Sequence, residues 1–265
     1  MTISPHLLET EIDYPDSDGA PMAESDPARD YLFYGVEALS IYFQNRDDVY
    51  VSGNLFIYYK QGVPDAVVAP DVFVVFGVEK RKRRSYKVWE EGDKLPSFVL
   101  EVTSKTTQEN DEEDKPKKYA QLGMEEYFQY DPTGDYLQPQ LKGSRLVMER
   151  YQAIAPVMLP DGVLSIRSQI LGLDLRLLGR DLRFYDLQTG TRLLSYSEEA
   201  QARQQAEQAL QQETQARQQV EQTLQQEAQA RREAIPRLLR LGLSAEQVAD
   251  SLNLSVEEVR QFVKP

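Results

Sequence analysis

Between residues 197 and 233 the composition of the chain changes abruptly. The segment is almost entirely Gln, Glu, Ala and Arg and contains neither Gly nor Pro. Residues 201–205 recur as residues 215–219, an offset of two heptads, which lets one seam stay on one face of a helix. We therefore predict one long helix here, with a separate region of the chain on either side of it.

The seam of this helix mixes apolar and charged residues. It would contain Ala206, Leu210, Glu213, Arg217, Val220 and Leu224. The two charged members predict a weak coiled coil, because such seams are usually apolar. The segment is either a dimerisation helix, which would make the protein a homodimer, or a solvated spacer held by charge pairs along one helix. The sequence favours neither of these.

The region beyond Pro236, which is expected to interrupt the long helix, predicts two short helices. Ser244 and Ser255 would cap them, each followed three residues later by Gln or Glu, the spacing of a capping box. The pair resembles a helix-turn-helix, but Glu257 and Glu258 suit major-groove contacts poorly. We expect a small protein-binding or packing unit. The predicted division of the chain is residues 1–194, 195–235 and 236–265.

The N-terminal region alternates helical and strand-like patterns. Such an order is typical of an α/β core, a mixed sheet flanked by helices. Ser25 is a suitable N-cap for the first helix, and Gly123 is placed to end the second. We expect helices over residues 25–43 and from 111 or 115 to 122, with strands at 49–59, 67–76, 97–103, 126–130, 145–152 and 182–187.

Charge and composition restrict the function classes. The chain of 265 residues has no cysteine, which excludes disulfides, thiolate zinc sites and cysteine nucleophiles. We expect no membrane span and no export signal, and hence a cytoplasmic location. The formal charge of −13 argues against tight non-specific binding to DNA. This charge does not exclude a nuclease, because the metal sites of nucleases concentrate carboxylates.

Two carboxylates lie in apolar, strand-like settings. Asp71 begins the run of residues 72–76, and Glu101 interrupts the run of residues 98–102. In a strand, Glu101 and Thr103 share one face, while Leu100 and Val102 take the other. A pair of carboxylates on adjacent strands suits Mg²⁺ or Mn²⁺, ions that could activate a water for phosphodiester hydrolysis. Alternatively, Asp71 fixes a turn and Glu101 forms a structural ion pair.

Four pieces of sequence in order carry a resemblance to a known family. They are Pro70-Asp71-Val72, Glu101-Val102-Thr103-Ser104, Asp111 with Lys115 and Tyr119, and Gly123-Met124-Glu125-Glu126-Tyr127-Phe128 before Asp131-Pro132. Over residues 12–190 the chain resembles the Uma-type family of restriction-endonuclease-like proteins, in the PD-(D/E)xK superfamily. The resemblance implies a restriction-endonuclease-like core with Asp71 and Glu101 as metal ligands.

One departure from that superfamily concerns its lysine, which usually lies two residues after the Glu. Thr103 occupies this position here. The resemblance suggests that Lys115, in the following helix, supplies the cation instead and acts as a catalytic residue. Glu24 is either a further metal ligand or an ordinary charge near a helix start. The lysines that compete with Lys115 for the role are Lys105, Lys117 and Lys118.

A basic cluster at residues 80–84 stands out in this acidic chain. It could hold phosphates if it lay near the site. A solvated loop is the favoured interpretation, because charge runs of this kind usually face water.

The combined prediction is a Mg²⁺-dependent endonuclease that hydrolyses DNA phosphodiester bonds, with two copies joined by the Gln-rich helix to address both strands. Two alternatives stay open. One is a binding module that keeps the fold without catalysis, as Thr103 in the lysine position allows. The other is a scaffold or regulatory protein that works through its C-terminal helices.

Overall fold

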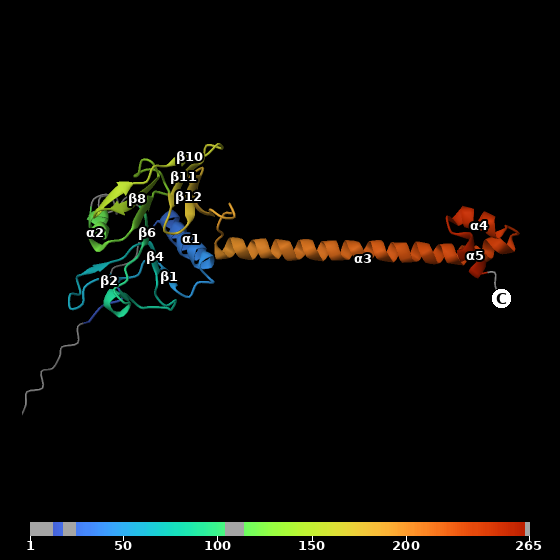
Figure 1. The fold of residues 1–265 in the computed structure, drawn as a ribbon, viewed down its shortest axis with the longest axis horizontal. Helices are drawn as coiled ribbons and strands as arrows, with labels where there is room; N and C mark the ends of the chain where they lie inside the picture. The colour runs from blue at the N-terminus through green and yellow to red at the C-terminus, as the bar shows by residue number, and fades with distance from the viewer. Residues whose placement is uncertain (1–12, 18–24, 104–113, 263–265) are drawn as a thin grey trace, which may run out of the picture. The chain divides into compact units, whose positions relative to one another are not determined.

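The computed structural model describes residues 13–17, 25–103 and 114–262. The chain divides into two compact units, Met1–Glu199 and Ala200–Pro265 (Figure 1). The first holds the sheets and the second is helical. The division into three regions stays a prediction.

The first unit contains two α-helices, a 3-10 helix and all the strands in the described part of the chain. Its helices are α1 (Asp26–Tyr42), η1 (Val88–Glu90) and α2 (Lys115–Leu122). The strands are β1 (Val49–Ser52), β2 (Ile57–Tyr58), β3 (Val67–Val68), β4 (Val72–Phe76), β5 (Tyr86–Lys87), β6 (Phe98–Val102), β7 (Glu126–Tyr130), β8 (Leu141–Val147), β9 (Arg150–Ala153), β10 (Val157–Met158), β11 (Leu164–Ser168), β12 (Leu173–Leu178) and β13 (Asp181–Asp186).

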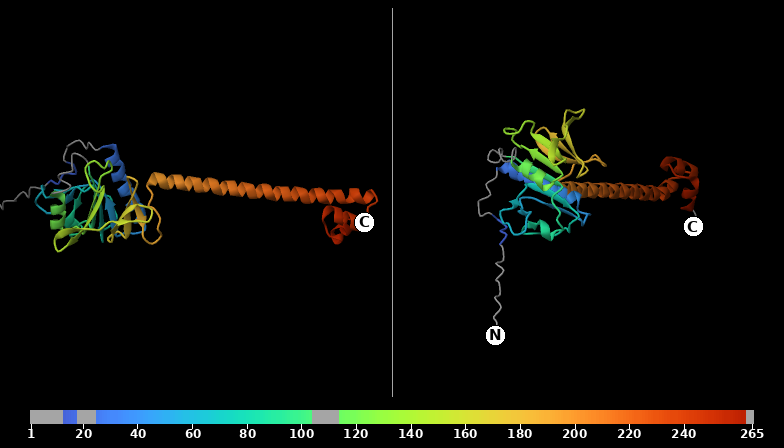
Figure 2. Two further views of the ribbon diagram at one scale, coloured as in Figure 1. Left: turned by 90° about the horizontal axis from the view of Figure 1, so that it is seen from above. Right: turned by 60° about the vertical axis from the view of Figure 1, so that its left-hand side comes forward.

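A mixed six-stranded sheet, in the order β1-β4-β6-β7-β8-β9, forms the centre of this unit. One face packs against α1, which contacts β1, β4 and β6, and against the four-stranded sheet β10-β11-β12-β13. The other face packs against α2 and the small sheet β3-β2-β5. Figure 2 shows α1 (blue) and α2 (green) with this sheet from two further directions. The predicted α/β class, a mixed sheet flanked by helices, is confirmed.

Strands β6 and β7 are the parallel pair within the central sheet, and α2 lies between them in the chain. A parallel pair needs such a crossover, because the chain must return to the same end of the sheet. Gly123 ends α2 in the left-handed conformation, with φ of 80°, as predicted. This β6-α2-β7 unit therefore brings the start of α2 back over the end of β6.

Three predicted strands are wrong in their extent. The strand expected over residues 49–59 is broken into β1 and β2 at Gly53 and Asn54, where Asn54 has a φ of 50°. The strand expected over residues 67–76 is broken into β3 and β4 at residues 69–71, where Pro70 has no N–H to donate. The strand expected over residues 145–152 is a β8–β9 hairpin that turns at Met148 and Glu149, both with positive φ.

The first helix and the last strand of this unit agree with the prediction. Ser25 caps α1 by accepting a hydrogen bond from the Ala28 N–H. Strand β13 falls at the position expected for residues 182–187. Strands β10, β11 and β12 were not predicted, and they complete the second sheet over α1.

The second unit consists of most of α3 (Tyr196–Arg240), followed by α4 (Ala245–Leu252) and α5 (Val256–Gln261). Both predicted capping boxes, at Ser244 and Ser255, are present. Figure 2 shows α3 as one unbroken helix with α4 and α5 folded beside its C-terminal end. In the part of the chain that the structure describes, no helix combines the length and apolarity needed to cross a bilayer.

The predicted interruption at Pro236 is wrong, because α3 continues to Arg240. Proline removes one intrahelical hydrogen bond, which usually ends a helix. Here Ile235 is fully buried against Val248 and Val259, with Leu238 beside them. This apolar packing holds the last turns of α3 in helical form.

Candidate functional site

The register of the central sheet aligns Asp71 with Glu101. Strands β4 and β6 pair with Val72 opposite Leu100. Continuing this antiparallel register by one residue places Asp71 opposite Glu101, and directly opposed side chains lie on one face with Cβ atoms about 5 Å apart. The Val102 N–H donates a hydrogen bond of 2.8 Å to Asp71 Oδ2, which fixes that carboxylate at the end of β4. The two predicted acidic residues are therefore neighbours.

Glu101 is fully buried and bound from two sides by α2. Lys115 Nζ lies 2.7 Å from Glu101 Oε2, and the Tyr119 hydroxyl donates a 2.7 Å hydrogen bond to Glu101 Oε1. Lys115 and Tyr119 are four residues apart, the spacing that places two side chains on one face of a helix. Leu100 and Val102 pack in the core on the opposite face of the sheet, so the predicted alternation along β6 is confirmed.

Tyr119 stays protonated at this position. Burial, followed by the charge of Glu101 and the hydrogen bond to it, raises the pKa of the Tyr119 hydroxyl well above its usual value. The charge of Asp71 also contributes, which shows that both carboxylates act on the same hydroxyl. A neutral phenol is a hydrogen-bond donor, so Tyr119 orients Glu101 without neutralising it. Tyr119 belongs to the third motif without a predicted role, and its spacing of four residues from Lys115 is the signal that could have indicated one.

The backbone of Asp71 is supported by the turn between β1 and β2. The Asn54 N–H donates to Pro70 O at 2.9 Å. A Cβ atom added at Gly53 would lie 2.1 Å from Asp71 O, closer than any real contact. Only glycine therefore allows the chain to pass this close to Asp71. Gly53 was not singled out from the sequence, because the approach joins segments distant in the chain.

Lys115 is distinguished from its neighbours on α2 by its contact with Glu101. Lys118 Nζ lies 4.7 Å from the centre of the Tyr59 ring. Lys117 lines a separate pocket with Glu149 and Arg150. A pocket of about 460 Å³ is lined by Val67, Val68, Ala69, Asp114, Lys115, Lys118 and Tyr119. Two of these residues, Lys115 and Tyr119, also bind Glu101, although Glu101 itself does not line the pocket.

The donor set fits a hard divalent cation. Asp71 and Glu101 offer carboxylate oxygens, and Mg²⁺ typically takes one or two protein carboxylates while keeping several waters. Within the described residues, Thr103 Oγ1 is buried without a hydrogen-bond partner, on the same face as Glu101. A buried hydroxyl of this kind is costly unless a water or ligand satisfies it. The described residues contain no cluster of three carboxylate or histidine ligands, so among them the candidate set consists of Asp71 and Glu101.

Residues 26–177, more than half of the chain, match the model of the Uma2 family, which is described as "Putative restriction endonuclease". The chain belongs to the Uma2 family. The match covers the central sheet, α2 and the site on β4 and β6, in agreement with the resemblance seen in the motifs. No curated protein matches the chain.

Four predicted positions of this Uma2 chain lie outside the described residues. They are Glu24, the possible extra ligand, Ser104, the end of the second motif, Lys105, a competing lysine, and Asp111, part of the third motif. The roles of Asp71, Glu101 and Lys115 as ligands and catalyst stay predictions, although the structure brings the three side chains together.

The Asp131-Pro132 part of the fourth Uma2 motif has a structural role. Asp131 is fully buried and accepts hydrogen bonds from the N–H groups of Thr133, Gly134, Tyr136 and Leu137. Burial raises the pKa of its carboxyl, but these hydrogen bonds outweigh burial and the pKa is lowered overall. Asp131 therefore holds the turn after β7 together as a carboxylate.

The basic cluster at residues 80–84 is not simply a solvated loop, because the interpretation is wrong for Arg83. The Arg83 side chain is only 2% exposed, binds Glu91 and lies 4.2 Å from the centre of the Tyr50 ring. Lys80 Nζ donates to the carbonyl oxygens of Phe43 and Gln44. These contacts are structural. They engage the cationic groups of Lys80 and Arg83, which phosphate binding would need.

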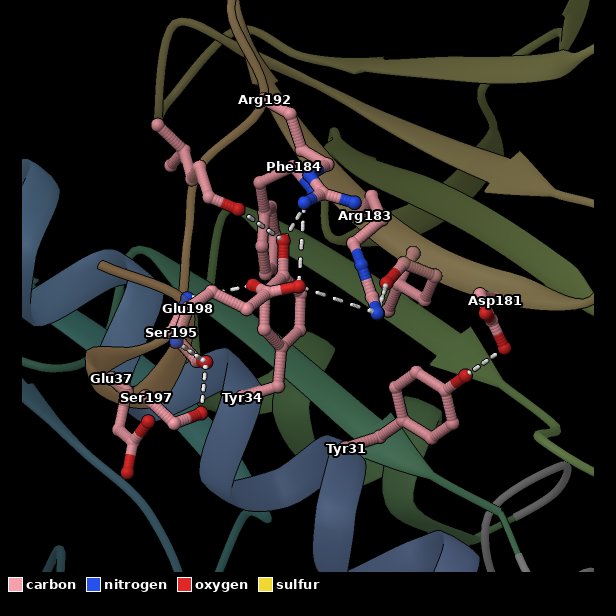
Figure 3. Close-up of polar contacts among 12 residues, drawn as sticks. Tyr31, Tyr34, Glu37, Asp181, Arg183, Phe184, Arg192, Ser195, Ser197 and Glu198 are labelled. Atoms are coloured by element: carbon pink, nitrogen blue, oxygen red, sulfur yellow. Dashed lines mark hydrogen bonds and ion pairs between the residues drawn. The ribbon is translucent and has the colours of Figure 1, made fainter. Parts of the chain in front are cut away.

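A further pocket, of about 460 Å³, lies where α1 meets the start of α3 (Figure 3). Its polar groups bind one another: Glu198 pairs with Arg192 at 3.3 Å and accepts from the Ser195 N–H. The Tyr34 hydroxyl donates to Leu193 O and accepts from the Phe184 N–H. This network attaches the first turn of α3 to the α/β unit, and we assign it no chemistry.

Proposed function

We propose that this Uma2 protein is a metal-dependent endonuclease that hydrolyses phosphodiester bonds in DNA. The observation that carries the proposal is the contact between Lys115 and Glu101, beside Asp71. It gives the site two carboxylates and a cation, as a phosphodiester-hydrolysing metal site needs, although position 103 is threonine. Family membership supports the nuclease class.

Asp71 and Glu101 would hold Mg²⁺ or Mn²⁺. Such an ion, when bound, activates a water and offsets charge on the scissile phosphate. Lys115, whose side chain is 21% exposed at the edge of the pocket, would stabilise negative charge that develops on the phosphate oxygens. Tyr119 would keep Glu101 in one orientation. The Val102 N–H would do the same for Asp71.

We further propose that the chain acts as a homodimer joined through α3. The exposed apolar side chains Leu210, Val220 and Leu224 on this helix support the proposal. They recur at heptad spacing on the seam predicted from the sequence.

The test is cleavage of supercoiled and single-stranded DNA with Mg²⁺ or Mn²⁺ by the full chain, compared with Asp71→Asn and Glu101→Gln. We expect each variant to lose about 10³-fold in rate, since the metal supplies several kcal/mol of transition-state stabilisation. Lys118→Ala is the matched control, because Lys118 lies on the same helix and lines the same pocket, but its ammonium group lies over the Tyr59 ring. It should retain most of the activity.

Cleavage that neither substitution reduces would come from a contaminant and would overturn the assignment. A wild-type protein without cleavage, but with calorimetric Mn²⁺ binding lost in Glu101→Gln, would favour the binding module. Absence of both cleavage and metal binding would favour the scaffold.

A further inference from the structure

The seam of α3 is exposed along the whole Gln-rich segment. Leu210, Val220 and Leu224 are 65%, 61% and 60% exposed. Single exposed apolar residues are common, but these three recur on one face of a regular helix. The face that carries them is therefore a candidate interaction surface, and its charged members decide what fits it.

Apolar and charged pairs alternate along this seam. Two apolar pairs, Ala206 with Leu210 and Val220 with Leu224, lie on either side of a charged pair, Glu213 with Arg217. Arg203 precedes the set and Glu227 follows it at the next seam positions. The steps of three and four residues read the same in both directions from the midpoint between Glu213 and Arg217. A helix with such a palindromic seam can align with a reversed copy of itself.

A reversed copy gives every layer a suitable partner. Leu210 lies opposite Val220 of the second copy, and Ala206 lies opposite Leu224. The charged layers are complementary: Arg217 faces Glu213 of the second copy, and Arg203 faces Glu227. Opposite charges attract at these short separations, so the charged residues fix the orientation of the pair.

A parallel copy gives the opposite result. In register, Arg217 would face its own copy, and so would Glu213. A shift by 14 residues, the repeat of the segment, would place Arg217 opposite Arg231 and Glu213 opposite Glu227. Like charges then meet in each charged layer, which disfavours every parallel alignment that keeps the apolar layers together.

The Glu213–Arg217 ion pair within α3 does not prevent these side chains from binding a second copy of the helix. Arg217 binds Glu213 of the same helix at 2.7 Å, but their side chains are 80% and 59% exposed. A solvated pair of this kind contributes little to stability. Both side chains can reach across to a partner helix, so the intrahelical pair does not oppose pairing between copies.

The repeat would also allow a reversed alignment centred seven residues further along the helix. That alignment needs Leu238 to lie opposite Ala206 of the second copy. Leu238 packs instead in the apolar cluster of Ile235, Val248 and Val259 in its own chain. The alignment centred between Glu213 and Arg217 avoids this conflict.

We propose that a second copy of this chain docks on the α3 seam in the antiparallel orientation, with Leu210 opposite Val220. The inference rests on the proposed homodimer and specifies its geometry. In this arrangement the two copies of Tyr196, where α3 begins, lie at opposite ends, about 57 Å apart along the helix axis. A parallel dimer would bring them together.

Disulfide crosslinking tests the orientation. The natural chain has no cysteine, so each substitution introduces a unique thiol. Full-length Leu210→Cys and Val220→Cys proteins are prepared separately, mixed under reducing conditions, oxidised, and separated on a non-reducing gel. We expect a covalent dimer from the mixture and only traces from either protein alone, because a disulfide needs Cα atoms about 4–7 Å apart.

A mixture of Gln211→Cys and Gln219→Cys is the matched control. These residues lie at the same levels of the pair but face away from the seam, so they should not crosslink. A self-disulfide of Leu210→Cys would overturn the antiparallel orientation while keeping the dimer. A monomer by analytical ultracentrifugation over the whole concentration range would overturn both. DNA cleavage enters neither readout, so the nuclease proposal is tested separately.

Discussion

Two buried glutamates on neighbouring strands of the central sheet have different surroundings. Glu101 on β6 and Glu126 on β7 are both fully buried. Glu126 lies opposite Phe98, three residues before Glu101, so the two carboxylates point to opposite faces of the sheet. Glu126 accepts from Arg145 at 2.7 Å, from the Ser168 hydroxyl and from the Gln169 N–H.

The difference lies in the balance of charge. Glu126 has an arginine as partner, which balances its charge, and two neutral donors. Glu101 pairs with Lys115 beside a second carboxylate, Asp71, so negative charge exceeds positive among these three side chains. Burial alone therefore does not identify a functional carboxylate. Two buried carboxylates sharing a face make a site that gains from a cation.

The largest predicted contrast is in stability. Glu126→Gln should lower the free energy of unfolding of the α/β unit by about 3 kcal/mol, because a neutral amide cannot accept all the hydrogen bonds that the buried carboxylate takes from Arg145, the Ser168 hydroxyl and the Gln169 N–H. Glu101→Gln should stay within about 1 kcal/mol of wild type, because Asp71 remains near Lys115 and one of two like charges is removed. Urea unfolding followed by the fluorescence of Trp89, the only tryptophan, reports on this unit.

Equal destabilisation by the two substitutions would contradict the comparison and make Glu101 a structural residue. A stability gain in Glu101→Gln would strengthen the comparison. Active sites often keep like charges close together at a cost in stability, and the substitution would remove the repulsion between Glu101 and Asp71.

Sequence patterns predicted those features of the site that depend on neighbouring residues in the chain. Alternation along β6 placed Glu101 opposite the apolar face, and the glycine after α2 fixed where that helix ends. The contact of Lys115 with Glu101 could not be derived from these rules, because it depends on how α2 returns over β6. The resemblance to a family suggested this lysine, and the structure gives its 2.7 Å contact.

The differences between the predicted and the observed elements also have physical causes. Strand β1 turns away at Gly53 because the backbone of Asp71 lies against it, a contact between segments distant in the sequence. The β8–β9 turn uses Met148 and Glu149 at positive φ, where a turn would usually have Asn or Gly. At Pro236, tertiary packing overrides the local preference for a break.

A smaller effect is expected at Tyr119, the positioning residue of the site. Tyr119→Phe removes the hydrogen bond to Glu101 and should lower Mn²⁺ affinity and cleavage by about 10–100-fold, as is typical for partners of metal ligands. Tyr151→Phe is the matched control, because it loses a partly buried hydrogen bond to Met124 O near the same face of the sheet. Calorimetry with Mn²⁺ alone gives the affinity. A similar loss in both variants would assign the effect to general packing.

The smallest predicted effect concerns a third buried carboxylate, Asp131, and appears only in acid. Although burial raises the pKa of Asp131, backbone and Thr133 hydrogen bonds lower it overall, so the unfolded chain takes up this proton more readily than the folded one. This carboxylate therefore stabilises the fold above the unfolded pKa, about 4, and the contribution is lost as pH falls through the lower folded-state pKa.

Asp131→Asn should accordingly be less stable than wild type at neutral pH, with the gap narrowing below about pH 4. Urea unfolding of both proteins from pH 3 to 7, read from Trp89, measures the gap. Asn is neutral and cannot titrate, so a gap that stays constant over this range would show that the charge of Asp131 is not what the turn requires.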